Sequence, residues 1–166
     1  MRYTFINHQF RIKIFLYSLI FSQYRLVRAM TNCRRRTMLI WERLPEAGGN
    51  NQFGDNKTEK LLYETALVQD FVINKMLLPL LQYKDAESFE NIGEYKVFEE
   101  FDKDKLKEAL LIGQEDTNLL IRQHYHHLRK LPRQDLPGAG KLRAKEWLVF
   151  LLLFEKVQAR ILGIEC

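Results

Sequence analysis

Residues 147–154, WLVFLLLF, form the longest uninterrupted apolar run in the chain. They lie inside a longer segment, residues 141–162, that contains neither proline nor glycine and has a helix-forming composition. A helix that is apolar on all sides belongs at the centre of a helical bundle, whereas a membrane span takes about 20 apolar residues. We therefore predict that this helix is buried, at roughly 1.5–3 kcal/mol of stabilisation per large side chain.

Two further segments have apolar side chains at the three-to-four residue spacing of an amphipathic helix. The first begins after the capping residue Asn56, and Pro79 is expected to kink or end it near Leu78. The second covers residues 102–131, and the segment between the two, residues 84–101, is expected to be irregular or a short helix. The predicted fold class is all-α: a small helical bundle of three main helices plus one or two short ones, with a basic N-terminal extension.

Charge divides the chain into two unlike parts. Residues 1–41 carry eight arginine and lysine side chains and no acid, while the remainder has 18 bases and 21 acids. Such an asymmetry indicates segments with different roles. The expected organisation is a basic, acid-free N-terminal extension at 1–44, a linker at 45–56 and a helical bundle domain at 57–166.

The N-terminal extension leaves several interpretations open. Its uncharged apolar run, residues 14–21, is too short to span a membrane, and no small-residue cleavage site follows it, as a secretory signal requires. A mitochondrial presequence shares its acid-free, basic composition. Met30 and Met38 are alternative start sites, so whether residues 1–29 belong to the native protein stays open. The arginine triplet at 34–36 is expected to be a solvated tail.

The cysteines and histidines do not predict a metal site or a cofactor. Cys33 and Cys166 are the two cysteines of the chain, too few for a disulfide framework or a Cys-x-x-Cys zinc site. They favour a reducing, cytoplasmic location, with the mitochondrion as the alternative if the extension is a presequence. His124 and His127 are three residues apart, but no third ligand lies one turn away.

One short motif suggests a ribonuclease. Arg122 and His127 form an R-x4-H pair, which resembles the R-x4–6-H motif of the HEPN-type nucleases, small all-α proteins that cut RNA without a metal. The resemblance implies that Arg122 holds the phosphate and that His127 acts as acid or base. It covers six residues, and on one straight helix the two side chains diverge by about 140°.

The same segment predicts a basic face. Arg122, His126, Arg129 and Arg133 follow four-three-four spacing and form one stripe opposite the leucines. Such a stripe can bind the phosphates of a nucleic acid. The competing interpretation is a solvated helix face, with acids at the start of the helix and bases at its end, as the helix dipole favours.

The functional prediction is a helical protein–protein interaction module, an adaptor, subunit or regulator without its own catalytic site. Its partner would be another protein or a second copy of the chain. The apolar side chains of the last helix and of residues 76–81 would supply the contact surface, because a small fold leaves some of them exposed. The alternative is an RNA-directed protein, either a HEPN-like metal-independent ribonuclease or a basic phosphate-binding domain.

Overall fold

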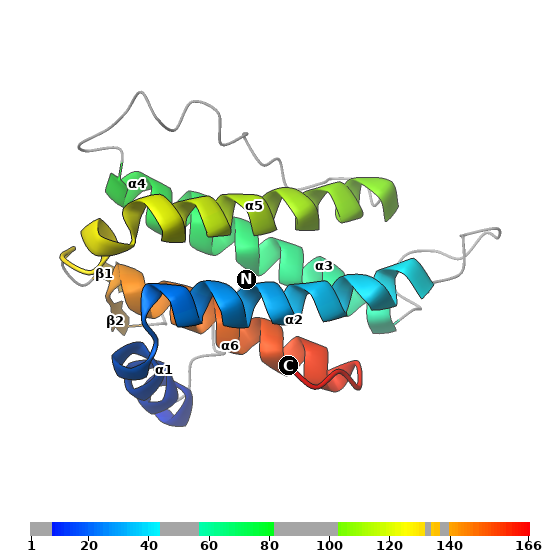
Figure 1. The fold of residues 1–166 in the computed structure, drawn as a ribbon, viewed down its shortest axis with the longest axis horizontal. Helices are drawn as coiled ribbons and strands as arrows, with labels where there is room; N and C mark the ends of the chain where they lie inside the picture. The colour runs from blue at the N-terminus through cyan, green and yellow to red at the C-terminus, as the bar shows by residue number, and fades with distance from the viewer. Residues whose placement is uncertain (1–7, 44–56, 82–102, 132–133, 137–139) are drawn as a thin grey trace.

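Helix α6, Ala144–Ile161, lies in the interior of the protein. The structure, a computed structural model, describes residues 8–43, 57–81, 103–131, 134–136 and 140–166 (Figure 1). Seven of the eight side chains of WLVFLLLF are buried and the eighth, Phe154, is half-buried. The first turn of α6 is capped by Glu146, whose carboxylate accepts a hydrogen bond from the backbone N–H of Arg143 at 2.7 Å. The prediction that this stretch forms a buried helix is confirmed.

Four long helical segments enclose the core. Helices α2, Gln23–Arg43, and α3, Lys57–Asp70, each pack against both α5, Lys103–Leu128, and α6. Helices α5 and α6 contact each other much less, so they lie diagonally across the bundle, with α2 in front and α3 behind in Figure 1. The predicted all-α bundle is confirmed, and its three main helices correspond to α3, α5 and α6.

The fourth long helix, α2, comes from the acid-free N-terminal stretch. Leu26 and Met30 of α2 are fully buried in the main core. Helix α1, His8–Ile20, packs across the end of the bundle, where its Phe10 ring meets Phe150 edge-on with 6.1 Å between centroids (Figure 1). The division of the chain into extension, linker and bundle domain stays a prediction, but α1 and α2 share one core with the rest.

A change of helix type precedes Pro79. The π-helix η1, Phe71–Leu77, joins α3 to the short helix α4, Leu78–Leu81. Proline lacks the backbone N–H that an α-helix needs and its ring crowds the preceding turn. A wider π-helical turn is one way in which a helix absorbs such a break. The helix therefore changes its winding before the proline and continues to Leu81, rather than ending near Leu78.

Most of the apolar residues that were expected to offer a contact surface are covered, but Val157 and Ile161 near the end of α6 are exposed. Elements α1, α2 and η1 pack against α6, and a contact surface on the last helix and residues 76–81 stays a prediction. The buried members of this set are Met76, Leu77, Leu78, Leu81 and the seven residues of α6 at 147–153.

The loop between α5 and α6 contains a short hairpin. Strands β1, Gln134–Leu136, and β2, Gly140–Leu142, pair antiparallel with Asp135 opposite Lys141. The predicted linker at 45–56 and the segment at 84–101 lie outside the described residues.

Candidate functional site

An ion pair between Arg34 of α2 and Glu155 of α6 lies inside the bundle. The guanidinium donates from Nε to Oε2 of Glu155 at 2.8 Å and from Nη2 to Oε1 at 2.6 Å. Both side chains are only 4% exposed. Two parallel hydrogen bonds are the geometry in which arginine binds a carboxylate most strongly. Removing a charge from water costs several kcal/mol, so each of these ions depends on the other.

Further hydrogen bonds bring α3 and α5 into contact with this pair. Arg34 donates from Nη2 to Oγ1 of Thr117 at 3.2 Å and from Nη1 to the carbonyl of Gln114 at 3.3 Å. The side-chain amide of Gln69 donates to Oε1 of Glu155 at 2.9 Å. These five residues, which we call the polar layer, join all four long helices at one level.

The residues of the polar layer pack closely against one another. A Cβ atom on Gly113 would lie 2.6 Å from Oε1 of Gln69, so a larger residue there would displace the end of the Gln69 side chain that donates to Glu155. The cavity lined by Gln69 and Glu155 is about 10 Å³, which is the space of about one water molecule. A more open cavity of about 350 Å³ lies between α2 and α5, lined by Arg34, Gln114 and Asn118 among others. The charged groups of the layer therefore bind one another, and their role is to fix how the helices pack.

The prediction that the arginine triplet is solvated is wrong for Arg34, which is buried. The other two members, Arg35 and Arg36, are exposed. Arg34 follows Leu26 and Met30 by eight and four residues, which places it on the buried face of α2. Glu155 follows eight apolar residues directly. A lone carboxylate at the end of a buried run was the sequence signal that a buried partner of opposite charge was needed.

The predicted basic stripe lies on the solvent side of α5. Arg122, His126 and Arg129 are exposed, while Arg133 lies outside the described residues. Arg122 and the half-buried His127 are both on α5, five positions apart, which turns their side chains about 140° from each other. The catalytic role of Arg122 and His127 and the binding role of the stripe stay predictions.

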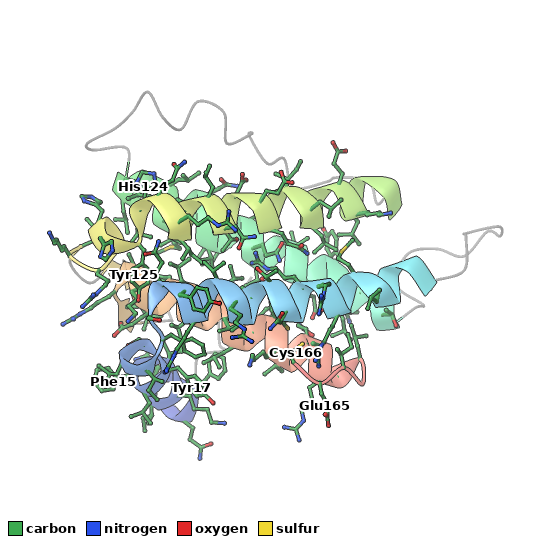
Figure 2. The ribbon with its side chains drawn as sticks, viewed as in Figure 1. Phe15, Tyr17, His124, Tyr125, Glu165 and Cys166 are labelled. Carbon is green, nitrogen blue, oxygen red and sulfur yellow. The ribbon has the colours of Figure 1, made fainter. Side chains whose placement is uncertain are left out.

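Helix α1 has apolar side chains on two opposite faces. One face packs on α6 and includes Ile14, which is fully buried. The opposite face is exposed: each of its residues keeps between 46% and 66% of its surface accessible, and Figure 2 shows Phe15 pointing away from α2 and α6. These residues fall within an arc of about 140° around the helix axis. We call this set the α1 face: Ile12, Phe15, Leu16, Leu19 and Ile20.

Positive charge borders the α1 face on both sides. Around the helix axis, Lys13 lies about 20° beyond Ile20, and Arg11 lies about 40° beyond Phe15. Both basic side chains are exposed, and the chain has no acid before Glu42. Single exposed apolar side chains are common on proteins, but a contiguous group with a charged border indicates an interaction site.

Contacts at the end of α1 hold the α1 face in position. Lys145 of α6 donates from Nζ to the carbonyl of Ser18, and the hydroxyl of Tyr125 donates to the carbonyl of Phe21 at 2.9 Å. The last carbonyls of a helix carry partial negative charge, and α1 has no basic residue of its own in its last turn. Burial, followed by the charge of Arg129, lowers the pKa of Lys145. Figure 2 shows Tyr125 where α5 approaches the junction of α1 and α2.

The α1 face cannot be recognised from the sequence pattern alone. The spacing of its residues is helical, as an amphipathic helix requires. However, the buried side of α1 is also apolar. Residues 14–21 are therefore apolar almost throughout, and their sequence does not distinguish the exposed face from the buried one.

Asp116 of α5 makes stability depend on pH. Burial, followed by the negative charge of Glu115, raises the pKa of Asp116 to about 6. The unfolded chain has a carboxyl pKa of about 3.9, so it binds fewer protons than the folded state between pH 4 and pH 6, and stability falls as the pH rises through this window. Because Asp116 is only half-buried, solvent screens its charge, and the free energy of unfolding falls by less than about 1 kcal/mol.

Asp116→Asn is therefore expected to raise the Tm by about 2 °C at pH 7 and to leave it unchanged near pH 3, where the aspartate is mostly protonated in both states. Thermal melts of both proteins at the two pH values measure this. An equal rise at both pH values would contradict the assignment, because it would show a gain unrelated to the carboxylate charge.

Comparisons with models of protein families, with curated proteins and with solved structures gave no match. Among the residues that the structure describes, no helix has the length and apolar composition to cross a membrane. In the same part of the chain, no three His, Cys, Asp or Glu side chains lie together as a metal site requires. The α1 face and the exposed stripe on α5 are the two surfaces that indicate binding of a partner.

Proposed function

We propose that the protein is a helical interaction module, an adaptor, subunit or regulator that binds another protein and has no catalytic site of its own. The observation that supports this most strongly is the α1 face, an exposed apolar surface on a helix that is anchored at its end. The polar layer adds support, because its buried charges are paired with each other.

The partner that fits the α1 face is a protein segment whose apolar side chains are bordered by Asp or Glu. Such acids would lie opposite Arg11 and Lys13, and complementary charge of this kind guides association and selects the partner. A second copy of the chain fits less well. Its α1 would bring the same positive charges to the contact, and residues 1–41 contain no acid to balance them.

The double substitution Phe15→Ser and Leu19→Ser tests the α1 face. The matched control is Leu111→Ser with Leu119→Ser, which removes two exposed apolar side chains from α5 instead. Each protein is cross-linked through Lys13 in its native cells, and the attached peptides are sequenced by mass spectrometry. The wild type and the control are expected to capture the same acidic, apolar peptide. The α1 variant should lose about thirty-fold in yield, since two half-exposed apolar contacts contribute about 1 kcal/mol each.

Three outcomes would overturn this proposal. The first is an equal yield of the same peptide from the folded α1 variant. The second is that the wild type is a dimer in light scattering and the α1 variant is a monomer, which would identify a second copy as the occupant. The third is that the wild type and the control co-sediment with vesicles of anionic lipid and the α1 variant does not, which would identify a membrane surface as the occupant.

The alternative proposal is an RNA-directed protein, and the exposed stripe of Arg122, His126 and Arg129 favours it. Cleavage of labelled RNA in EDTA that Arg122→Ala or His127→Ala abolishes would replace our proposal by a HEPN-like ribonuclease. Salt-dependent RNA binding without cleavage, weakened by Arg129→Ala, would replace it by a phosphate-binding domain.

We also propose a cytoplasmic location, with the mitochondrion as the alternative. Import with cleavage before Met30 would remove α1 and the start of α2 from the mature protein. The mass of the protein isolated from its native cells distinguishes the two, because a cytoplasmic protein keeps α1.

A further inference from the structure

The tail that follows α6 folds back onto α2. Gly163 has a φ of 78°, the left-handed conformation that ends many helices, and the N–H of Ile164 donates back to the last turn of α6 at 2.9 Å. The guanidinium of Arg36 on α2 then donates to the carbonyl of Glu165. Figure 2 shows Glu165 and Cys166 on the tail that follows α6.

This fold-back brings together the two cysteines of the chain, which are 133 positions apart in sequence. Sγ of Cys166 lies 3.9 Å from the carbonyl oxygen of Cys33. Cys33 is buried and Cys166 is exposed. Burial raises the pKa of the Cys33 thiol well above its usual range, and a hydrogen bond with the thiol of Cys166 raises it further. The fold-back therefore places the thiol of Cys166 against Cys33.

We propose that Cys33 and Cys166 are a redox modification site, at which hydrogen peroxide converts the two thiols into a disulfide that ties the tail to α2. The sulfur of Cys166 attacks one peroxide oxygen, the O–O bond breaks, and one water leaves with the thiol proton, so that a sulfenic acid forms. The sulfur of Cys33 then attacks the sulfenic sulfur, an S–S bond forms, and the second water carries away the hydroxyl and the Cys33 proton. The two thiols lose two electrons, and the peroxide gains them.

The order of the two steps follows from burial. Oxidation begins at an accessible sulfur, and the exposed Cys166 meets the oxidant first. Cys33 is shielded from solvent, so it reacts second, as the resolving thiol, and gives up its proton as the S–S bond forms. This assignment agrees with a cytoplasmic location, where disulfides are usually transient and redox-sensing.

The test uses the reduced full chain, treated with hydrogen peroxide and then unfolded in an alkylating reagent. The expected product is a monomer that has lost two hydrogens, takes up no reagent, and yields a peptide pair joining Cys33 to Cys166. Its Tm should exceed that of the reduced protein by at least about 5 °C, because the bond closes a very long loop in the unfolded chain. Treatment with a thiol reductant should reverse the shift.

Two variants control the test. Cys166→Ser changes an exposed residue, so the reduced protein should keep its Tm and show no rise with peroxide. Cys33→Ala keeps the buried site small and apolar, and should accumulate a sulfenic acid at Cys166 that dimedone traps. The proposal is overturned if oxidised wild type is a dimer linked through two Cys166 residues, if Cys33 still takes up the alkylating reagent, or if the Tm does not move.

Discussion

Glu155→Ala is expected to lower the free energy of unfolding by about 3–5 kcal/mol, because it leaves the guanidinium of Arg34 buried without an opposite charge. It also removes the acceptor of the Gln69 amide, an additional unpaired buried group. The total stability of a domain is about 5–15 kcal/mol, so this single change takes a large share of it. Urea denaturation of the variant and the wild type measures the loss.

The double variant Arg34→Met with Glu155→Leu distinguishes the contribution of the ion pair to stability from the contribution of packing. It removes both charges and keeps most of the buried volume, so it is expected to be clearly more stable than Glu155→Ala. The matched control is Arg35→Met, which changes an exposed neighbour and should stay within about 0.5 kcal/mol of the wild type. A Glu155→Ala protein within about 1 kcal/mol of the wild type would refute a buried, mutually dependent pair.

A chain that begins at Met38 is expected to lose its cooperative fold entirely. It lacks α1 and most of α2, and therefore Leu26, Met30 and Arg34, which lie in the interior. Helix α6 would lose two of the elements that cover it, and Glu155 would lose its counter-charge. These combined losses exceed the 5–15 kcal/mol that holds a typical domain together. A thermal melt followed by circular dichroism should show no sigmoidal transition, and an apolar dye should bind.

A chain that begins at Met30 is intermediate in length between the full chain and the chain that begins at Met38. It keeps Met30 and Arg34 but lacks α1 and Leu26, so it should fold with a lower Tm than the full chain. If the Met38 chain instead melted cooperatively near the Tm of the full protein, the bundle domain at 57–166 would be self-sufficient. That outcome would uphold the predicted domain division and contradict the shared core described above.

Local sequence patterns were enough to predict the helices that became α3, α5 and α6. The last helix was expected at 141–162 and spans Ala144–Ile161, and the run WLVFLLLF is buried as predicted. Helical periodicity, capping residues and breakers act over a few residues, so they can be recognised without knowing what else packs nearby. The sequence also placed Arg122, His126 and Arg129 on one face of a helix, and all three are exposed.

Tertiary packing alone decided which charges lie inside and which apolar side chains stay outside. Among three adjacent arginines, Arg34 is buried because Glu155, from the far end of the chain, lies opposite it. The α1 face is exposed because α6 covers only the other side of α1. Cys33 and Cys166 are in contact because a glycine-terminated helix returns the tail to α2. Each of these features joins residues that are distant in sequence, and periodicity identifies a helix face but not the element that covers it.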